Sequence, residues 1–168
     1  MEKCLEYNVI TAAMILSDRD ILQGRGASIQ PFREKNLTPN GYDLTVAEVY
    51  MEDGQNIEKA SCSVPPGAWF AVSTEEYVKL ETWVSGSLWI RTSWARKGVI
   101  SSFGMVDAGF EGTLTLSALN ASAKPLPISP GDRFAQIVMH ALTGNAEDSY
   151  ASRSGNYQGQ RGVTLSRE

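Results

Sequence analysis

The chain has 168 residues, of which 42% are hydrophobic and 20% charged, a composition typical of one globular domain. Its 15 lysines and arginines against 19 aspartates and glutamates leave a formal net charge of -4. This balance lacks the basic excess expected of a protein that binds a long phosphate backbone, but it is compatible with a small phosphorylated ligand. No apolar run is long enough to span a bilayer and residues 1–14 do not resemble a secretory signal, so we expect a cytoplasmic protein.

Two common catalytic constellations find little support. His140 is the only histidine, and it follows an apolar run, which favours a strand histidine over a member of a Ser-His-Asp triad. The cysteines, Cys4 and Cys62, form no C-x-x-C pair. The zinc-dependent nucleobase deaminases need H-x-E together with P-C-x-x-C, and neither pattern is present.

In chain order, residues 1–13 form an extension without an assigned role. Ser17 followed by Asp20 is typical of a capping box and predicts a short helix over 18–23, which Gly24 and Gly26 would end. Strand-like segments separated by breakers then follow at 42–49, 68–72, 88–90, 99–100, 113–119 and 134–142. Many short strands with little helix predict an all-β domain over 14–143, built as a barrel, jelly roll or sandwich.

The last segment, 144–168, is rich in serine, glycine, asparagine, glutamine and arginine and has no periodicity. Such a segment is either disordered or a mobile arm that orders over a ligand. Composition alone favours disorder.

Three segments contain groups suited to chemistry. RTSWAR (91–96) places two guanidinium groups around two hydroxyls, which suits phosphate oxygens, although a solvated strand end reads equally well. GMVDAGFEG (104–112) places Asp107 between an apolar segment and a glycine-rich turn; partial desolvation would suit this carboxylate to proton abstraction from water. The alternative is a turn in which Asp107 accepts backbone N–H groups. GYDL (41–44) reads as a turn that leads into a strand.

Taken in order, these segments resemble the dUTPase and dCTP deaminase superfamily, and most closely the archaeal-type dUTPases. The family's motifs are similar to GYDL (41–44), RTSWAR (91–96), VDAGFEG (106–112) and GDRFAQI (131–137), and its C-terminal lid is similar to YQGQRG (157–162). The similarity extends from about Met14 to Leu165. It implies a distorted β-barrel or jelly roll that forms a homotrimer, with active sites between subunits. From the charge balance and the lack of a long apolar run we expect no nucleic-acid partner and no membrane.

The resemblance also implies roles for single residues. Asp107 would be the base that activates water, and Mg²⁺ would be held chiefly by phosphate oxygens and water. The triphosphate would be bound by Arg91, Thr92, Ser93, Arg96 and Gln136. The nucleoside, with uracil read by a hairpin over 99–106 and the deoxyribose packed on Phe110, would be bound by Ser101, Gly104, Val106, Phe110, Thr115, Leu116 and Ser117. The lid would contain Tyr150, Asn156, Tyr157 and Gln160.

The superfamily contains two activities, and Ser117 favours one of them. The deaminase branch uses a glutamate ten residues beyond the aspartate of the third motif, a count that here leads from Asp107 to Ser117. A hydroxyl near its ordinary pKa cannot shuttle protons to a cytosine ring as a carboxylate can. We therefore expect a dUTP diphosphatase. The alternatives are a dCTP deaminase, alone or bifunctional, and a nucleotide-binding trimer without catalysis.

Overall fold

The computed structural model describes residues 14–51, 56–58 and 60–165, so the predicted extension over 1–13 lies outside the described residues. In the described part the helices are short: α1 (Asp18–Leu22), η1 (Glu34–Asn36, a 3-10 helix), α2 (Thr92–Ala95) and α3 (Tyr150–Arg153). The strands are β1 (Ala27–Gln30), β2 (Leu37–Thr38), β3 (Gly41–Met51), β4 (Asn56–Glu58), β5 (Cys62–Val64), β6 (Trp69–Thr74), β7 (Tyr77–Leu80), β8 (Val84–Ile90), β9 (Val99–Ser101), β10 (Met105–Val106), β11 (Glu111–Gly112), β12 (Thr115–Asn120), β13 (Leu126–Ile128) and β14 (Arg133–Ala141).

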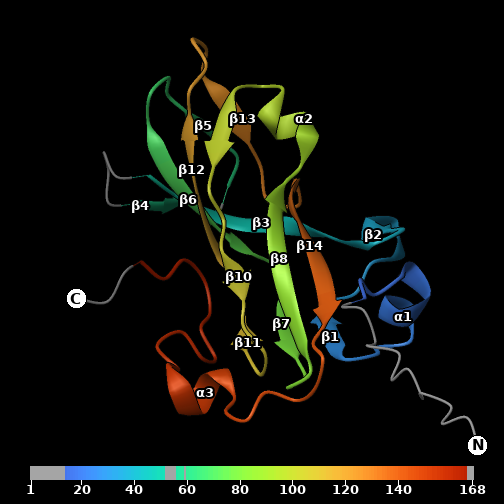
Figure 1. Cartoon of the computed structure of the whole chain (residues 1–168). Helices are drawn as coiled ribbons and strands as arrows, with labels where there is room; N and C mark the ends of the chain where they lie inside the picture. Colours follow the sequence, from blue (N-terminus) through green and yellow to red (C-terminus); the bar gives the residue numbers. More distant parts are fainter. Residues whose placement is uncertain (1–13, 52–55, 59, 166–168) are drawn as a thin grey trace, which may run out of the picture.

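These strands form one large antiparallel sheet and two small ones. The large sheet follows the order β10-β8-β14-β3-β6-β12-β9, with β2 and β4 also paired to β3. It is curled into an open half-barrel (Figure 1), and the smaller sheets are β1-β7-β11 and β13-β5. The predicted all-β, barrel-like fold with one short N-terminal helix is confirmed. No helix among the described residues has the length and apolar character needed to cross a membrane.

Local sequence signals account for several elements. The Ser17 side chain accepts from the Asp20 N–H, and the Asp20 carboxylate accepts from the Ser17 N–H at 3.1 Å, so the predicted capping box is present. The helix ends at Leu22, with Gln23 as its C-cap rather than its last residue. His140 lies in β14, as predicted, with its Nε2 2.9 Å from the Ser87 hydroxyl oxygen.

An aromatic cluster around Phe134 joins the large sheet to α2. The Phe134 side chain is 1% exposed, and its ring centroid lies 6.0 Å from that of Phe70, 5.4 Å from that of Trp94 and 6.2 Å from that of Phe103. The Trp94 indole N–H donates to the Arg133 carbonyl at 2.7 Å. The core therefore fixes α2 against the start of β14.

We predict that Phe134→Ala lowers the free energy of unfolding by about 3–5 kcal/mol, because it removes a ring that three other aromatic side chains contact. Urea denaturation followed by circular dichroism measures this change. Leu22→Ala is the control: Leu22 is 54% exposed, and we expect a change within about 0.5 kcal/mol. Equal effects of the two substitutions would contradict the central place given to Phe134.

Candidate active site

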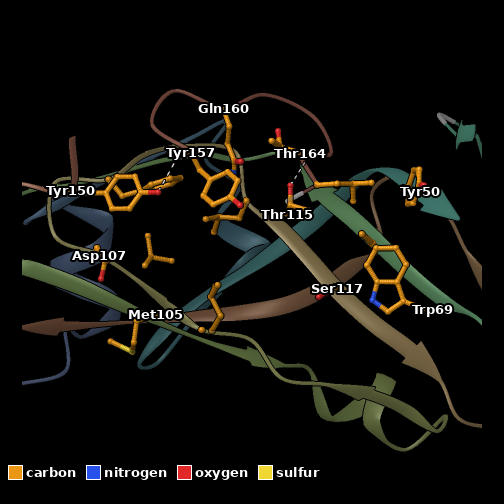
Figure 2. A pocket seen from close by; sticks show the side chains of 17 residues that line it. Tyr50, Trp69, Met105, Asp107, Thr115, Ser117, Tyr150, Tyr157, Gln160 and Thr164 are labelled. Carbon is orange, nitrogen blue, oxygen red and sulfur yellow. Dashed lines mark hydrogen bonds between the residues drawn. The ribbon is translucent and has the colours of Figure 1, made fainter. Parts of the chain in front are cut away.

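A cavity of about 630 Å³ lies beside the turn that follows β10. Its walls come from β3, β6, β8, β10 and β12, and from the C-terminal segment that begins at α3 (Figure 2). The curl of the sheet is what brings β10 and β12 to the same cavity, although they stand near opposite ends of the strand order. The cavity is lined by Tyr50, Trp69, Ala71, Leu88, Gly104, Met105, Val106, Asp107, Phe110, Leu114, Thr115, Ser117, Tyr150, Tyr157, Gln160, Thr164 and Leu165.

Asp107 stands at this cavity at the start of a tight turn. The Phe110 N–H donates to the Asp107 carbonyl at 3.1 Å. Gly109 has a φ of +79°, which glycine adopts with little strain, and a Cβ there would lie 2.8 Å from the Ser149 Cβ. The Asp107 side chain is exposed. The predicted partial desolvation is therefore wrong for a single chain, because the preceding apolar side chain, Val106, turns into the core and leaves the carboxylate facing solvent.

Alternate residues of β12 face the cavity. Thr115 and Ser117 line it, whereas Leu116 and Ala118 are 2% and 3% exposed and belong to the core. This is the alternation of a strand with one buried face. Leu116 was predicted to contact the nucleoside, but the structure places its side chain on the opposite face of the sheet.

Asp107 is the sole carboxylate among the described residues that line the cavity. Glu111, at the end of the same turn, forms an ion pair with Lys79 of β7, with 3.4 Å between Oε2 and Nζ. The Glu111 carboxylate is therefore paired outside the cavity.

The segment 99–106 is not a paired hairpin, contrary to the prediction. Its first strand, β9, pairs with β12, and its second, β10, pairs with β8. Gly104 and Val106 line the cavity as predicted, but Ser101 lies in β9 opposite Ala118 and is not one of the lining residues. The hairpin was implied by the resemblance, and in this structure each of its two strands pairs with a different neighbour.

The C-terminal segment is folded against the domain, although its composition favours disorder. The ring centroids of Tyr150 and Phe110 lie 5.5 Å apart at an angle of 70°. The Gln160 side-chain amide donates to the Thr113 carbonyl at 2.7 Å. These contacts join residues distant in sequence, so composition alone could not reveal them. Of the predicted lid residues, Asn156 is exposed and not part of the cavity lining, and the three at the cavity are Tyr150, Tyr157 and Gln160.

A second, basic pocket of about 390 Å³ lies at the junction of α2 with β14. Two residues of the predicted phosphate set, Arg91 and Ser93, line it. The prediction missed three cations: Arg133 stands inside the fourth motif, where it could have been noticed, whereas Lys35 and Lys97 carry no motif signal. The complete lining is Lys35, Arg91, Ser93, Trp94, Lys97, Gly131, Asp132 and Arg133.

The other predicted phosphate ligands are not part of this lining. Thr92 and Arg96 are exposed at the two ends of α2. Gln136 lies on β14, where its side-chain amide donates to the Thr38 hydroxyl at 2.7 Å. The structure therefore brings only part of the predicted phosphate set together on one chain.

A buried carboxylate holds two of the cations of the basic pocket. Asp43 is 3% exposed, and its Oδ2 lies 2.8 Å from the Arg91 Nε and 3.3 Å from the Arg133 Nη1. Burial raises the pKa of Asp43, and the guanidinium groups of Arg91 and Arg133 oppose this rise. Asp43 thus offsets the repulsion between two like charges that converge on one pocket.

The cavity and the basic pocket are separate on one chain. They share no lining residue. Figure 1 shows α2, which contributes to the basic pocket, and α3, which contributes to the cavity, at opposite ends of the molecule. Within the described ranges, no group of three or more histidine, cysteine, aspartate or glutamate side chains could hold a metal ion.

Known proteins similar to this chain include both deaminases and dUTP hydrolases. A dCTP deaminase from Thermococcus kodakarensis is 39% identical over 142 residues, which cover 83% of this chain and 90% of the relative. A viral protein named "Probable deoxyuridine 5'-triphosphate nucleotidohydrolase", from Sulfolobus islandicus rod-shaped virus 1, is 34% identical over 161 residues, which cover 92% of this chain and 99% of the relative.

Solved structures show the same fold at low identity. The 2'-deoxycytidine 5'-triphosphate deaminase from Agrobacterium tumefaciens superposes with a TM-score of 0.66 at 17% identity, over 77% of this chain and 49% of that one, so this chain spans about half its length. The native EIAV dUTPase superposes with a TM-score of 0.53 at 17% identity, over 76% of this chain and 98% of that one.

The family model described as dCTP deaminase-like matches residues 15–142. This match covers most of the β domain, from the residue before Leu16 to the end of β14, and includes both pockets except for the C-terminal segment. The chain therefore belongs to the dCTP deaminase-like family.

Proposed function

We propose that this protein is a dUTP diphosphatase, which hydrolyses dUTP to dUMP and pyrophosphate. One observation carries the proposal: Asp107 is the sole carboxylate among the described residues lining the cavity, and β12 presents the Ser117 hydroxyl where the deaminase branch has a glutamate. A single general base suffices for attack of water on phosphorus. The similarity to the viral protein with a dUTP hydrolase name also supports it.

We further propose that the complete site forms between subunits of a homotrimer. The cavity of one subunit would hold the nucleoside, and the basic pocket of a neighbour would hold the phosphates. Two findings support this arrangement: the two pockets share no residue, and Asp107 is exposed on the single chain. A neighbouring subunit that covers Asp107 would supply the desolvation that one chain lacks.

In the proposed site each group has a defined task. Arg91 and Ser93 bind phosphate oxygens, with Lys35, Lys97 and Arg133 adding positive charge. The Phe110 ring supports the deoxyribose, and the backbone of Gly104–Val106 contacts the base. Thr92, Arg96 and Gln136 flank the phosphate region. To bind the triphosphate, the exposed side chains of Thr92 and Arg96 would have to turn toward the pocket, and Gln136 would have to release its hydrogen bond to Thr38. The C-terminal segment closes the cavity through Tyr150, Tyr157 and Gln160.

Asp107 takes a proton from a water molecule directed at the α-phosphorus, and pyrophosphate leaves with the electrons of the broken P–O bond. General-base assistance of this kind contributes on the order of 10²–10⁴-fold in rate. Magnesium, when bound, neutralises phosphate charge and orients the chain of phosphates. Since no cluster of acidic or histidine ligands is found in the described part of the chain, we expect phosphate oxygens and water to be its main ligands.

The second candidate function is dCTP deamination, and the names of the relatives favour it. The similar proteins from Thermococcus kodakarensis and Pyrococcus furiosus are both named dCTP deaminase. Against this stands the chemistry of Ser117, because an ordinary hydroxyl cannot accept and return protons at neutral pH as a carboxylate does.

A product assay separates the two activities. With magnesium present, we expect pyrophosphate and dUMP from dUTP, and neither ammonia nor dUTP from dCTP. Chromatography of the nucleotides and an ammonia assay measure both reactions side by side. Robust release of ammonia from dCTP would show that the argument from Ser117 is wrong.

We predict that Asp107→Asn lowers kcat by about 10²–10⁴-fold while the affinity for a non-hydrolysable dUTP analogue changes little, because the amide cannot take the proton of the attacking water. Stopped assays of pyrophosphate and calorimetric titration measure the two quantities. Glu111→Gln is the control, since its carboxylate is paired with Lys79 and is not part of the cavity lining. Near-normal turnover in Asp107→Asn would show that Asp107 is not the general base.

Asp43→Asn tests the basic pocket. Without the buried carboxylate, Arg91 and Arg133 repel each other and lose their fixed positions, so we expect KM for dUTP to rise about tenfold, with a smaller change in kcat. Glu81→Gln makes the same change in net charge at an exposed carboxylate outside both pockets and should leave KM unchanged. An unaltered KM in Asp43→Asn would show that this pocket does not bind the substrate.

A further inference from the structure

The cavity has a polar end that the proposed reaction does not use. In Figure 2 Asp107 stands at one end and Trp69 at the other, with Ser117 between them. The register of β6 and β12 explains this place: Trp69 pairs with Leu119, and the next residue on the same face, Ala71, pairs with Ser117. Trp69 and Ser117 therefore project from the same side of adjacent strands.

The Trp69 ring is held by packing. Its centroid lies 5.9 Å from that of Tyr50 on β3, at an angle of 72°, an edge-to-face contact that limits rotation of the indole. Ala71, which lies opposite both Tyr50 and Ser117 in the strand ladders, is small and leaves space beside the indole. The Trp69 side chain is 36% exposed, so its edge is accessible from the cavity.

The accessible edge of Trp69 includes a hydrogen-bond donor. An indole N–H can donate but cannot accept. For Trp69, no described residue accepts this hydrogen bond, whereas the indole N–H groups of Trp89 and Trp94 donate to the Ser87 hydroxyl and to the Arg133 carbonyl. Figure 2 shows the nitrogen-bearing edge of the Trp69 ring turned toward Ser117.

We propose that Trp69 is a specificity-determining residue that selects a pyrimidine with a carbonyl oxygen, rather than an amino group, at ring position 4. The inference rests on the proposed function and deepens it. With the α-phosphate beside Asp107 and the deoxyribose against Phe110, the base extends past Thr115 toward Ser117 and Trp69. There the 4-oxygen of uracil accepts a hydrogen bond from the indole N–H. The 4-amino group of cytosine is itself a donor, so it would face the indole N–H without forming a hydrogen bond.

Ser117 does not provide this selection by itself. A hydroxyl both donates and accepts, so it can satisfy either a carbonyl or an amino group. The indole cannot adapt in this way, and a site that meets a substrate group with a fixed partner discriminates against an analogue that cannot pair. Trp69 therefore contributes the selective interaction, and Ser117 completes the hydrogen bonding of the same oxygen.

The test measures binding and does not depend on turnover. Affinities of the α,β-imido analogues of dUTP and dCTP, with magnesium present, are obtained by calorimetry for the wild type and for Trp69→Phe. We expect the wild type to prefer the uracil analogue, and the variant to lose about tenfold of that preference, mainly through weaker binding of the uracil compound. Trp89→Phe is the matched control, because Trp89 is not part of the cavity lining.

A third ligand shows whether the lost preference comes from the 4-oxygen. The corresponding α,β-imido deoxynucleotide with a 2-pyrimidinone base lacks that oxygen and also the N3 hydrogen of uracil. Its binding should be weaker than that of the uracil analogue in the wild type, and this difference should shrink by about tenfold in Trp69→Phe, where Ser117 still donates to the oxygen of uracil. A uracil preference that is unchanged in Trp69→Phe overturns the inference while leaving dUTP hydrolysis intact. Absence of pyrophosphate release from dUTP overturns the proposed function and is seen in a separate assay. Equal melting temperatures of wild type and variant confirm that the fold is retained.

Discussion

The antiparallel register between β6 and β12 is the constraint on which the cavity depends. Because side chains alternate across a strand, one register places Phe70, Leu116 and Ala118 in the core and leaves Thr115 and Ser117 facing the cavity. A shift by one residue would exchange these sets and bury hydroxyls while exposing apolar groups. The free energy of core burial therefore also fixes the chemistry that the cavity presents.

Charge is divided between the two ends of the molecule. The cavity is mostly apolar and aromatic with one carboxylate, and the cations converge on α2 and the start of β14, where Asp43 holds Arg91 and Arg133 together. A nucleoside triphosphate has the same division, with an apolar ring at one end and several negative charges at the other. In the proposed assembly, joining two copies brings the complementary halves together, which explains how so small a chain can process such a ligand.

The sequence predicted those parts of the structure that depend on local interactions. The capping box of Ser17 and Asp20, the strand around Tyr42 and the turn after Asp107 follow from spacing and residue type. It did not predict features set by distant partners. Gln160 donates a hydrogen bond to the carbonyl of Thr113, which lies 47 positions away in the sequence. Ser101 pairs with Ala118 of β12 and so does not line the cavity. Composition and alternation contain no record of such pairings, which is why composition favoured a disordered tail; the hairpin that the resemblance implied is not formed, because β9 and β10 pair with different strands.

The two activities of the family differ physically in what stands near ring position 4 of the base. Deamination needs a group there that moves protons, while hydrolysis needs chemistry only at the phosphate and leaves that end of the cavity to recognition. Here β12 presents a hydroxyl, and the neighbouring strand presents an indole whose hydrogen has no acceptor among the described residues. Neither group shuttles protons at neutral pH, and both can donate to a carbonyl. In the proposed function, the same two side chains that disfavour attack on cytosine are suited to holding uracil, so the choice of reaction and the choice of base would have a common structural origin.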